Sequence, residues 1–155
     1  MKITGTSHVG YIVKDLGVVI PFYRDALGLK LLSGPSEEFH DVNEGKAMGI
    51  VGENKTHCHR EAFFETPDGT LLEFIEITDP VPVPIPPTAA CAGKLHLCLF
   101  VDNMDEWVNH LEDYGVYPFM KPQYALMGDG TQCIWVYFRD PEGILFELQE
   151  IRNVG

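Results

Sequence analysis

The segment HVGYIVKD (residues 8–15) returns in altered form as HLCLFVDN (residues 96–103). Each copy places a histidine at the head of an apolar run, and a stretch with helical spacing then ends at a glycine. That glycine comes 20 residues after the first histidine, at Gly28, and 19 residues after the second, at Gly115. Later parts correspond too, since TPDGTLLEF (66–74) aligns with DPEGILFEL (140–148). The chain is therefore predicted to be a duplicated module.

Each copy is predicted to follow the order β-α-β-β-β. The apolar runs are 5 to 8 residues long and rich in Val, Ile, Leu and Phe, which favours strands. Pro-Asp-Gly and Pro-Glu-Gly predict tight turns between the last two strands. The helix of the first copy is predicted from one apolar stripe, formed by Leu16, Val19, Ile20, Tyr23 and Leu27.

The two helix starts carry different signals. In the first copy we expect Gly17 to be the cap, because Pro21 then falls in the first turn, where its missing N–H costs least. In the second copy Asn103 is the expected N-cap, and Glu106 three residues later resembles a capping box.

Domain boundaries follow from the repeat. We expect a first module over residues 1–79, a proline-rich linker over 80–93 and a second module over 94–155. Residues 79–87 hold five prolines in nine positions, which predicts an extended, stiff segment. The first module also carries an insertion at about 36–55, so its His-to-Glu spacing is 65 residues against 51 in the second. Loops of that length are often functional lids.

Composition excludes several classes of partner. The chain has 155 residues, 45% of them hydrophobic, and 11 Lys+Arg against 23 Asp+Glu give a formal charge of −12. Such a charge repels phosphate backbones and anionic membrane surfaces, so we expect neither nucleic acid nor a membrane as a partner. No apolar run reaches about 20 residues and the first ten residues lack an apolar signal region, which predicts a cytoplasmic protein. The four cysteines have no CxxC spacing and are expected to be free thiols.

Four side chains with metal-ligand chemistry occupy equivalent places in the repeat. His8 and His96 head the first strands, and Glu73 and Glu147 lie on the last strands. Strand alternation puts each glutamate on a mostly apolar face, where a carboxylate is normally paired, protonated or bound to a metal. Two imidazoles and two carboxylates suit one divalent ion such as Ni, Zn, Co, Mn or Fe(II). A structural histidine in each strand is the alternative interpretation.

The chain resembles the vicinal oxygen chelate superfamily, which includes glyoxalase I, methylmalonyl-CoA epimerase, extradiol dioxygenases, fosfomycin-resistance enzymes and bleomycin-resistance proteins. The matching segments are HVGYIVKDLGVVIPFYRDALGLKLL, TPDGTLLEF, KLHLCLFVDNMDEWVNHLEDYGV and RDPEGILFELQE. The resemblance implies an α+β fold in which two tandem βαβββ modules form a curved, partly open mixed sheet barrel around a metal site. It also implies that His8, Glu73, His96 and Glu147 are the metal ligands.

The resemblance further implies an activity. Filling all four ligand positions points to the glyoxalase I and epimerase branch, where a divalent ion assists removal of a carbon-bound proton from a small substrate with adjacent oxygens. Glu147 or Glu73 would then serve as the base, and Glu61 resembles the second base that an epimerase needs. Only four arginines are present, so no phosphate cluster for coenzyme A and no carboxylate clamp for glutathione is evident.

Two other functions stay open from the sequence. One is an Fe(II) ring-cleaving dioxygenase of the extradiol type, in which Glu73 would be a bystander. The other is a metal-free ligand-binding or antibiotic-resistance protein. A homodimer is expected by resemblance, with modules paired within one chain or exchanged between two.

His57 and His59 flank Cys58 and would face the same way on a strand. This spacing suggests a second metal site, for which the sequence offers no third ligand.

Overall fold

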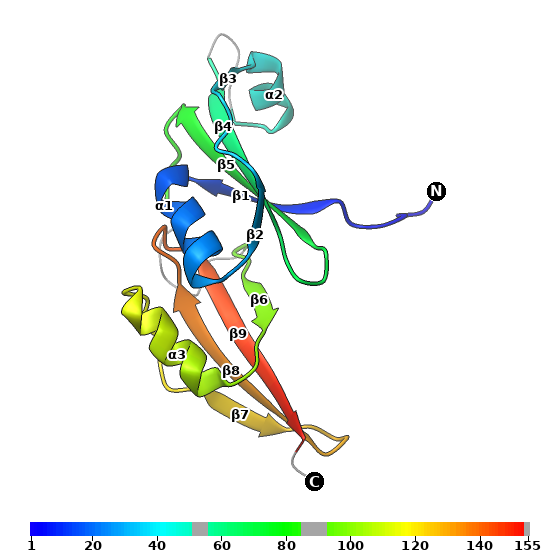
Figure 1. Cartoon of the computed structure of the whole chain (residues 1–155). Coiled ribbons are helices and arrows are strands. Elements are labelled where there is room, and N and C mark those ends of the chain that lie inside the picture. The colour runs from blue at the N-terminus through cyan, green and yellow to red at the C-terminus, as the bar shows by residue number, and fades with distance from the viewer. Residues whose placement is uncertain (51–55, 85–92, 154–155) are drawn as a thin grey trace. The chain divides into compact units, whose positions relative to one another are not determined.

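The computed structural model describes residues 1–50, 56–84 and 93–153 and divides the chain into two compact units, Met1–Pro84 and Ile85–Gly155 (Figure 1). Most of the predicted proline-rich linker over 80–93 lies outside the described residues, as does the end of the insertion predicted at about 36–55. The units are considered one at a time.

The first unit is a mixed sheet covered by one helical segment. Its elements are β1 (His8–Val13), α1 (Leu16–Pro21), the π-helical turn η1 (Phe22–Ala26), β2 (Lys30–Ser33), β3 (Phe39–His40), α2 (Val42–Ala47), β4 (Cys58–Glu65) and β5 (Leu71–Asp79). The strand order is β1-β5-β4-β2, and β3 also pairs with β4. The pair β1 and β5 is parallel, whereas β4 is antiparallel to its neighbours. The insertion therefore supplies β3 and α2.

The second unit repeats this order without the insertion. It comprises β6 (Leu97–Phe100), α3 (Met104–Asp113), β7 (Gln123–Leu126), β8 (Thr131–Arg139) and β9 (Leu145–Asn153). The strand order is β6-β9-β8-β7, with β6 and β9 parallel. The predicted α+β class and the duplicated βαβββ module are thus confirmed. The strands make two sheets that do not close into a barrel within the described ranges.

Each sheet has a helix-covered face and an opposite face, set by the alternation of side chains along the strands. In the first unit the ring of Tyr23 lies 4.5 Å from that of Phe74 and 6.0 Å from that of Phe64, all three buried. In the second unit Phe138 and Phe146 stack at 5.2 Å. The intervening residues of the same strands, which include Glu73 and Glu147, lie on the other face.

The first helix begins two residues earlier than predicted. Asp15, not Gly17, is the N-cap, and its carboxylate accepts a hydrogen bond of 2.7 Å from the backbone N–H of Gly17. Pro21 consequently lies at the end of α1, where it cannot donate a hydrogen bond to the preceding turn. The helix continues as η1, in which the N–H of Leu27 donates to the carbonyl of Phe22, five residues back.

The second helix begins at the predicted place but is capped differently. Asn103 is the N-cap residue of α3, yet its side chain makes no capping hydrogen bond. The expected capping box with Glu106 is therefore wrong. The carboxylate of Glu150 on β9 instead accepts a 2.7 Å hydrogen bond from the N–H of Met104, the first helical residue.

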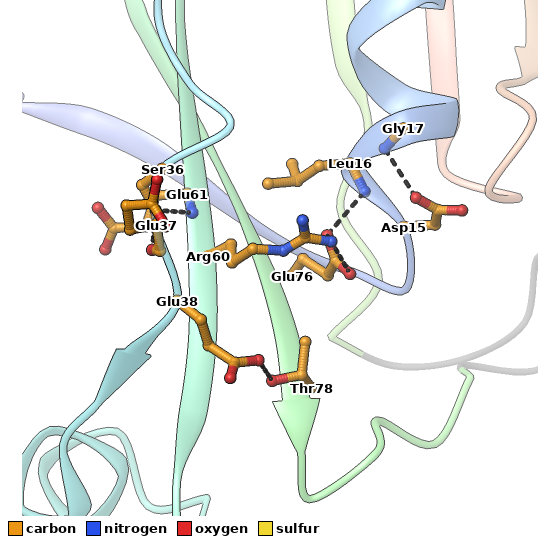
Figure 2. Close-up of polar contacts among 10 residues, drawn as sticks. All are labelled: Asp15, Leu16, Gly17, Ser36, Glu37, Glu38, Arg60, Glu61, Glu76 and Thr78. Carbon is orange, nitrogen blue, oxygen red and sulfur yellow. Dashed lines mark hydrogen bonds and ion pairs between the residues drawn. The ribbon is translucent and has the colours of Figure 1, made fainter.

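The first unit uses the same arrangement. Glu76 on β5 accepts a 3.1 Å hydrogen bond from the N–H of Leu16 and contacts Arg60 at 2.8 Å (Figure 2). Glu150 likewise pairs with Arg152. Each carboxylate follows the predicted metal ligand of its strand by three residues and therefore points to the helix-covered face. These two buried glutamates tie the start of each helix to its sheet.

Two smaller predictions have outcomes. The predicted tight turns are confirmed, with Gly69 and Gly143 in the left-handed region at φ of 86° and 87°. Cys58, Cys98 and Cys133 are free thiols, whereas Cys91 lies outside the described residues.

Within the described part of the chain, the helices are too short or too polar to cross a membrane.

Candidate metal centre

The first unit brings His8 and Glu73 into contact. Their strands are parallel neighbours, and Nε2 of His8 lies 3.1 Å from Oε2 of Glu73. Gly10 pairs directly with Glu73, and a Cβ at Gly10 would lie 3.4 Å from the same carboxylate oxygen. The Oγ atom of Ser7 lies 3.2 Å from Nδ1 of His8, the nitrogen that faces away from the glutamate. A partner on Nδ1 fixes ring orientation and leaves Nε2 available as a ligand.

The second unit makes the matching contact. Nε2 of His96 lies 3.0 Å from Oε2 of Glu147, and the Glu147 residue is buried. Its cross-strand neighbours differ from those in the first unit, because Cys98 and Tyr137 flank Glu147 where Gly10 and Phe63 flank Glu73. The ring of Tyr137 also meets that of His96 edge-on at 5.4 Å.

Both neighbours of Glu147 respond to it electrostatically. Burial raises the pKa of the Cys98 thiol to about 12, and the charge of Glu147 and a hydrogen bond to it add to the shift. Burial likewise raises the pKa of Tyr137, again with the charge and hydrogen bonding of Glu147 as further causes. Both groups are therefore protonated donors at neutral pH.

Glu73 has a different environment. Burial raises the pKa of its carboxyl above the usual value, the neighbouring His8 opposes that shift, and the charges of Glu61 and Glu44 reinforce it. Its flanking residues, Gly10 and Phe63, have no side-chain hydrogen-bond donor. The two carboxylates therefore differ in the side chains that lie opposite them on the neighbouring strands.

The spacing of each pair fits a metal chelate. Two ligand atoms at about 2.1 Å from one ion lie about 3.0 Å apart when they subtend a right angle. The 3.1 Å and 3.0 Å separations match that value. An imidazole nitrogen and a carboxylate oxygen also form a donor set that divalent transition ions accept. Each unit therefore contains one His–Glu pair with the chemistry and spacing of a metal chelate.

The family of the chain follows from comparison with known proteins. Residues 5–148 match the model of the Glyoxalase/Bleomycin resistance protein/Dioxygenase superfamily. The chain belongs to this superfamily. Uncharacterized protein YaeR of Escherichia coli K12 is 29% identical over 143 residues, which cover 92% of this chain and 93% of YaeR.

Solved structures in the superfamily share the fold. A glyoxalase family protein from Bacillus cereus is 25% identical with a TM-score of 0.79, and the match covers 97% of this chain and 96% of that one. The fosfomycin resistance protein FosX from Listeria monocytogenes, solved with Mn(II) and sulfate ion, is 19% identical with a TM-score of 0.55 over 96% of this chain and 93% of its own.

Glu61 is the fifth residue that the sequence predicts for the site of this superfamily member. It lies on β4 opposite Ile75 of β5, two cross-strand positions from the Phe63–Glu73 pair, and therefore on the same face as Glu73. Its Oε1 atom lies 3.3 Å from Nε2 of His59. The sequence analysis did not predict this contact.

Three further residues at the candidate site were not predicted. Cys98 and Tyr137 flank Glu147, and Glu44 comes from α2 in the insertion. For Cys98 a signal was available, since it follows His96 by two residues as Gly10 follows His8. Tyr137 and Glu44 depend on strand register and on the path of the insertion.

Proposed function

We propose that this chain is a metal-dependent enzyme that transfers a proton on a small substrate with adjacent oxygens, either as a glyoxalase I-like lyase or as an epimerase or isomerase. The observation that carries the proposal is the repeated His–Glu contact, with His8 and Glu73 in one unit and His96 and Glu147 in the other. A structural histidine has no need of a buried carboxylate at chelating distance in both copies.

These four residues would hold one divalent ion (Ni, Zn, Co, Mn or Fe(II)), with the two pairs meeting in one chain or across a homodimer. Bound there, such an ion supplies Lewis-acid polarisation of the substrate oxygens and so acidifies the neighbouring C–H bond. The protein side chains supply the other two functions. His8 and His96 would help to hold the ion, and a glutamate carboxylate would accept the proton.

Glu73 is the proposed base. Cys98 and Tyr137, whose side chains can donate hydrogen bonds, lie opposite Glu147, whereas Gly10 and Phe63 lie opposite Glu73. A base must move from its resting contact to the substrate carbon, and the absence of side-chain donors opposite Glu73 favours that movement. Glu61, on the same face, is the predicted second base if the reaction is an epimerisation.

The contact between His8 and Glu73 also argues against the alternative of an extradiol dioxygenase. An extradiol dioxygenase requires two histidines and one carboxylate, which would leave Glu73 without a role. A side chain only 14% exposed and 3.1 Å from a ligand histidine is poorly explained as a bystander. A metal-free binding protein would leave both carboxylates unexplained.

Solvent deuterium exchange tests the reaction class. The metal-loaded protein is incubated in D₂O with a panel of α-hydroxycarbonyl compounds and thioester-activated carboxylates. We expect deuterium to enter the carbon next to the chelating oxygens, with the same rate under anaerobic conditions because proton transfer consumes no O₂. Conversion of catechols that stops without O₂ would favour the dioxygenase instead. Exchange in none of the panel, with binding of an aromatic ligand by the metal-free protein, would favour a binding protein.

A further inference from the structure

A second cluster of ligand side chains lies on β4 and α2 of the first unit. Nε2 of His59 is 3.3 Å from Oε1 of Glu61 and 3.7 Å from Oε2 of Glu44. One ligand atom from each of the three residues lies within 4.8 Å of the others. Two ligand atoms about 2.1 Å from one ion are about 3.4 Å apart at the tetrahedral angle, and the 3.3 Å His59–Glu61 separation is close to that value.

The histidines of the cluster are buried without their usual partners. His59 is 2% exposed and His57 is 1% exposed. Nδ1 of His59 and both ring nitrogens of His57 have no hydrogen-bond partner among residues 1–50, 56–84 and 93–153. The two rings lie 5.0 Å apart, which places a second imidazole beside the cluster. Buried ring nitrogens are normally satisfied. The His59 nitrogen that faces the two carboxylates is Nε2, so the unsatisfied nitrogens available to a cation here are those of the His57 ring.

Local structure holds each ligand in position. The Asp41 carboxylate caps α2 by accepting hydrogen bonds from the N–H groups of Asn43 and Glu44, and the Asp41 N–H donates to the carbonyl of His57. Ser36 binds both backbone polar groups of Glu61. Its Oγ accepts a 3.0 Å hydrogen bond from the Glu61 N–H (Figure 2), and its own N–H donates to the Glu61 carbonyl. The ring of Phe39 stacks on that of His59 at 5.2 Å.

We propose that Glu44, His59 and Glu61 form a second divalent-cation site, with His57 as the neighbouring imidazole available to complete it. The site is separate from the His8–Glu73 pair, although its carboxylates are close enough to act on Glu73 electrostatically. A nitrogen and two carboxylate oxygens are a donor set that suits Zn²⁺. A bound cation would also offset the negative charges of Glu61 and Glu44, both of which act on Glu73.

Zinc titration of the full chain tests this proposal. The metal-free protein is titrated with Zn²⁺ by calorimetry, in parallel with His59→Ala, Glu44→Gln and the double variant His8→Ala/His96→Ala. Outer-shell substitutions already weaken metal sites by roughly 10–100-fold, so loss of a direct ligand should cost at least about 100-fold in affinity. We expect one class of Zn²⁺ binding to disappear in His59→Ala and Glu44→Gln but to persist in the His8→Ala/His96→Ala variant.

Controls separate this site from the proposed catalytic one and from misfolding. Glu44 is 44% exposed, so Glu44→Gln should fold normally, and Glu37→Gln alters an exposed neighbour outside the cluster. Tetrahedral Co²⁺ absorption in the His8→Ala/His96→Ala variant is a second supporting result. The proposal is overturned if His59→Ala and Glu44→Gln bind Zn²⁺ like the parent protein, or if the double histidine variant binds none. Loss of exchange activity in Glu61→Gln with unchanged Zn²⁺ binding would also overturn it and would favour Glu61 as a base.

Discussion

Replacing Glu73 by glutamine is expected to lower the rate of substrate deuterium exchange by about 10²–10⁴-fold, the range of a lost general base. The amide has nearly the same shape but accepts no proton, so the rate falls while the protein still folds. Because Glu73 is also a proposed metal ligand, the variant and the parent are compared at saturating metal, where both are loaded. The measurement is the initial exchange rate at saturating metal, beside elemental analysis of the same sample.

Two variants make this result specific to Glu73. Glu65→Gln is the matched control, since Glu65 lies on β4 with Lys30 2.8 Å away and should exchange at the parent rate. Glu147→Gln tests the alternative base. If Glu147→Gln loses exchange at full metal occupancy while Glu73→Gln retains it, the assignment of the base to Glu73 is wrong.

Replacing Glu150 by alanine is expected to lower the free energy of unfolding by about 2 kcal/mol, since hydrogen bonds to a charged group contribute roughly 1.5–3 kcal/mol. The variant removes the acceptor of the Met104 N–H and the partner of Arg152. For a chain of this size the midpoint of thermal unfolding should fall by about 4–8 °C. Glu112→Ala, at an exposed position of α3, the helix that Glu150 caps, should leave the midpoint within about 1–2 °C of the parent value.

The effect of Glu150→Ala should depend on pH in a definite direction. The hydrogen bond from Arg152 is the main cause that lowers the pKa of Glu150 below its ordinary value of 4.5. A carboxyl with a lowered folded-state pKa stabilises the fold above the ordinary pKa and loses that contribution as pH falls through the folded-state value. The difference between parent and variant should therefore be full at pH 7 and shrink below about pH 4.5. A difference that stays constant down to pH 3 would contradict the role given to this carboxylate.

Duplication made much of the architecture predictable from the sequence. Matching His and Glu positions in two segments predicted that these four residues occupy equivalent places. The structure adds that each histidine contacts the glutamate of its own unit. Strand alternation also predicted the face on which each glutamate lies. These inferences need only local pattern and symmetry.

The incorrect or missing predictions depend on tertiary geometry. Glu76 and Glu150 cap helices that begin about 60 and 46 residues earlier, and no local pattern announces such a contact. Glu44 meets His59 because the insertion folds back on β4, which sequence spacing does not determine. The first helix start is a different case. Asp15 precedes Leu16 directly and is a favoured N-cap type, so greater weight on that preference than on Pro21 would have placed it correctly.

Elemental analysis of purified protein tests the central proposal most directly. The account predicts a metal held jointly by His8, Glu73, His96 and Glu147, so His8→Ala in one unit and Glu147→Gln in the other should each lose the same equivalent of bound metal. Glu106→Gln, on an exposed position of α3, serves as the control and should keep the parent content. Unchanged metal content in both His8→Ala and Glu147→Gln would contradict the account.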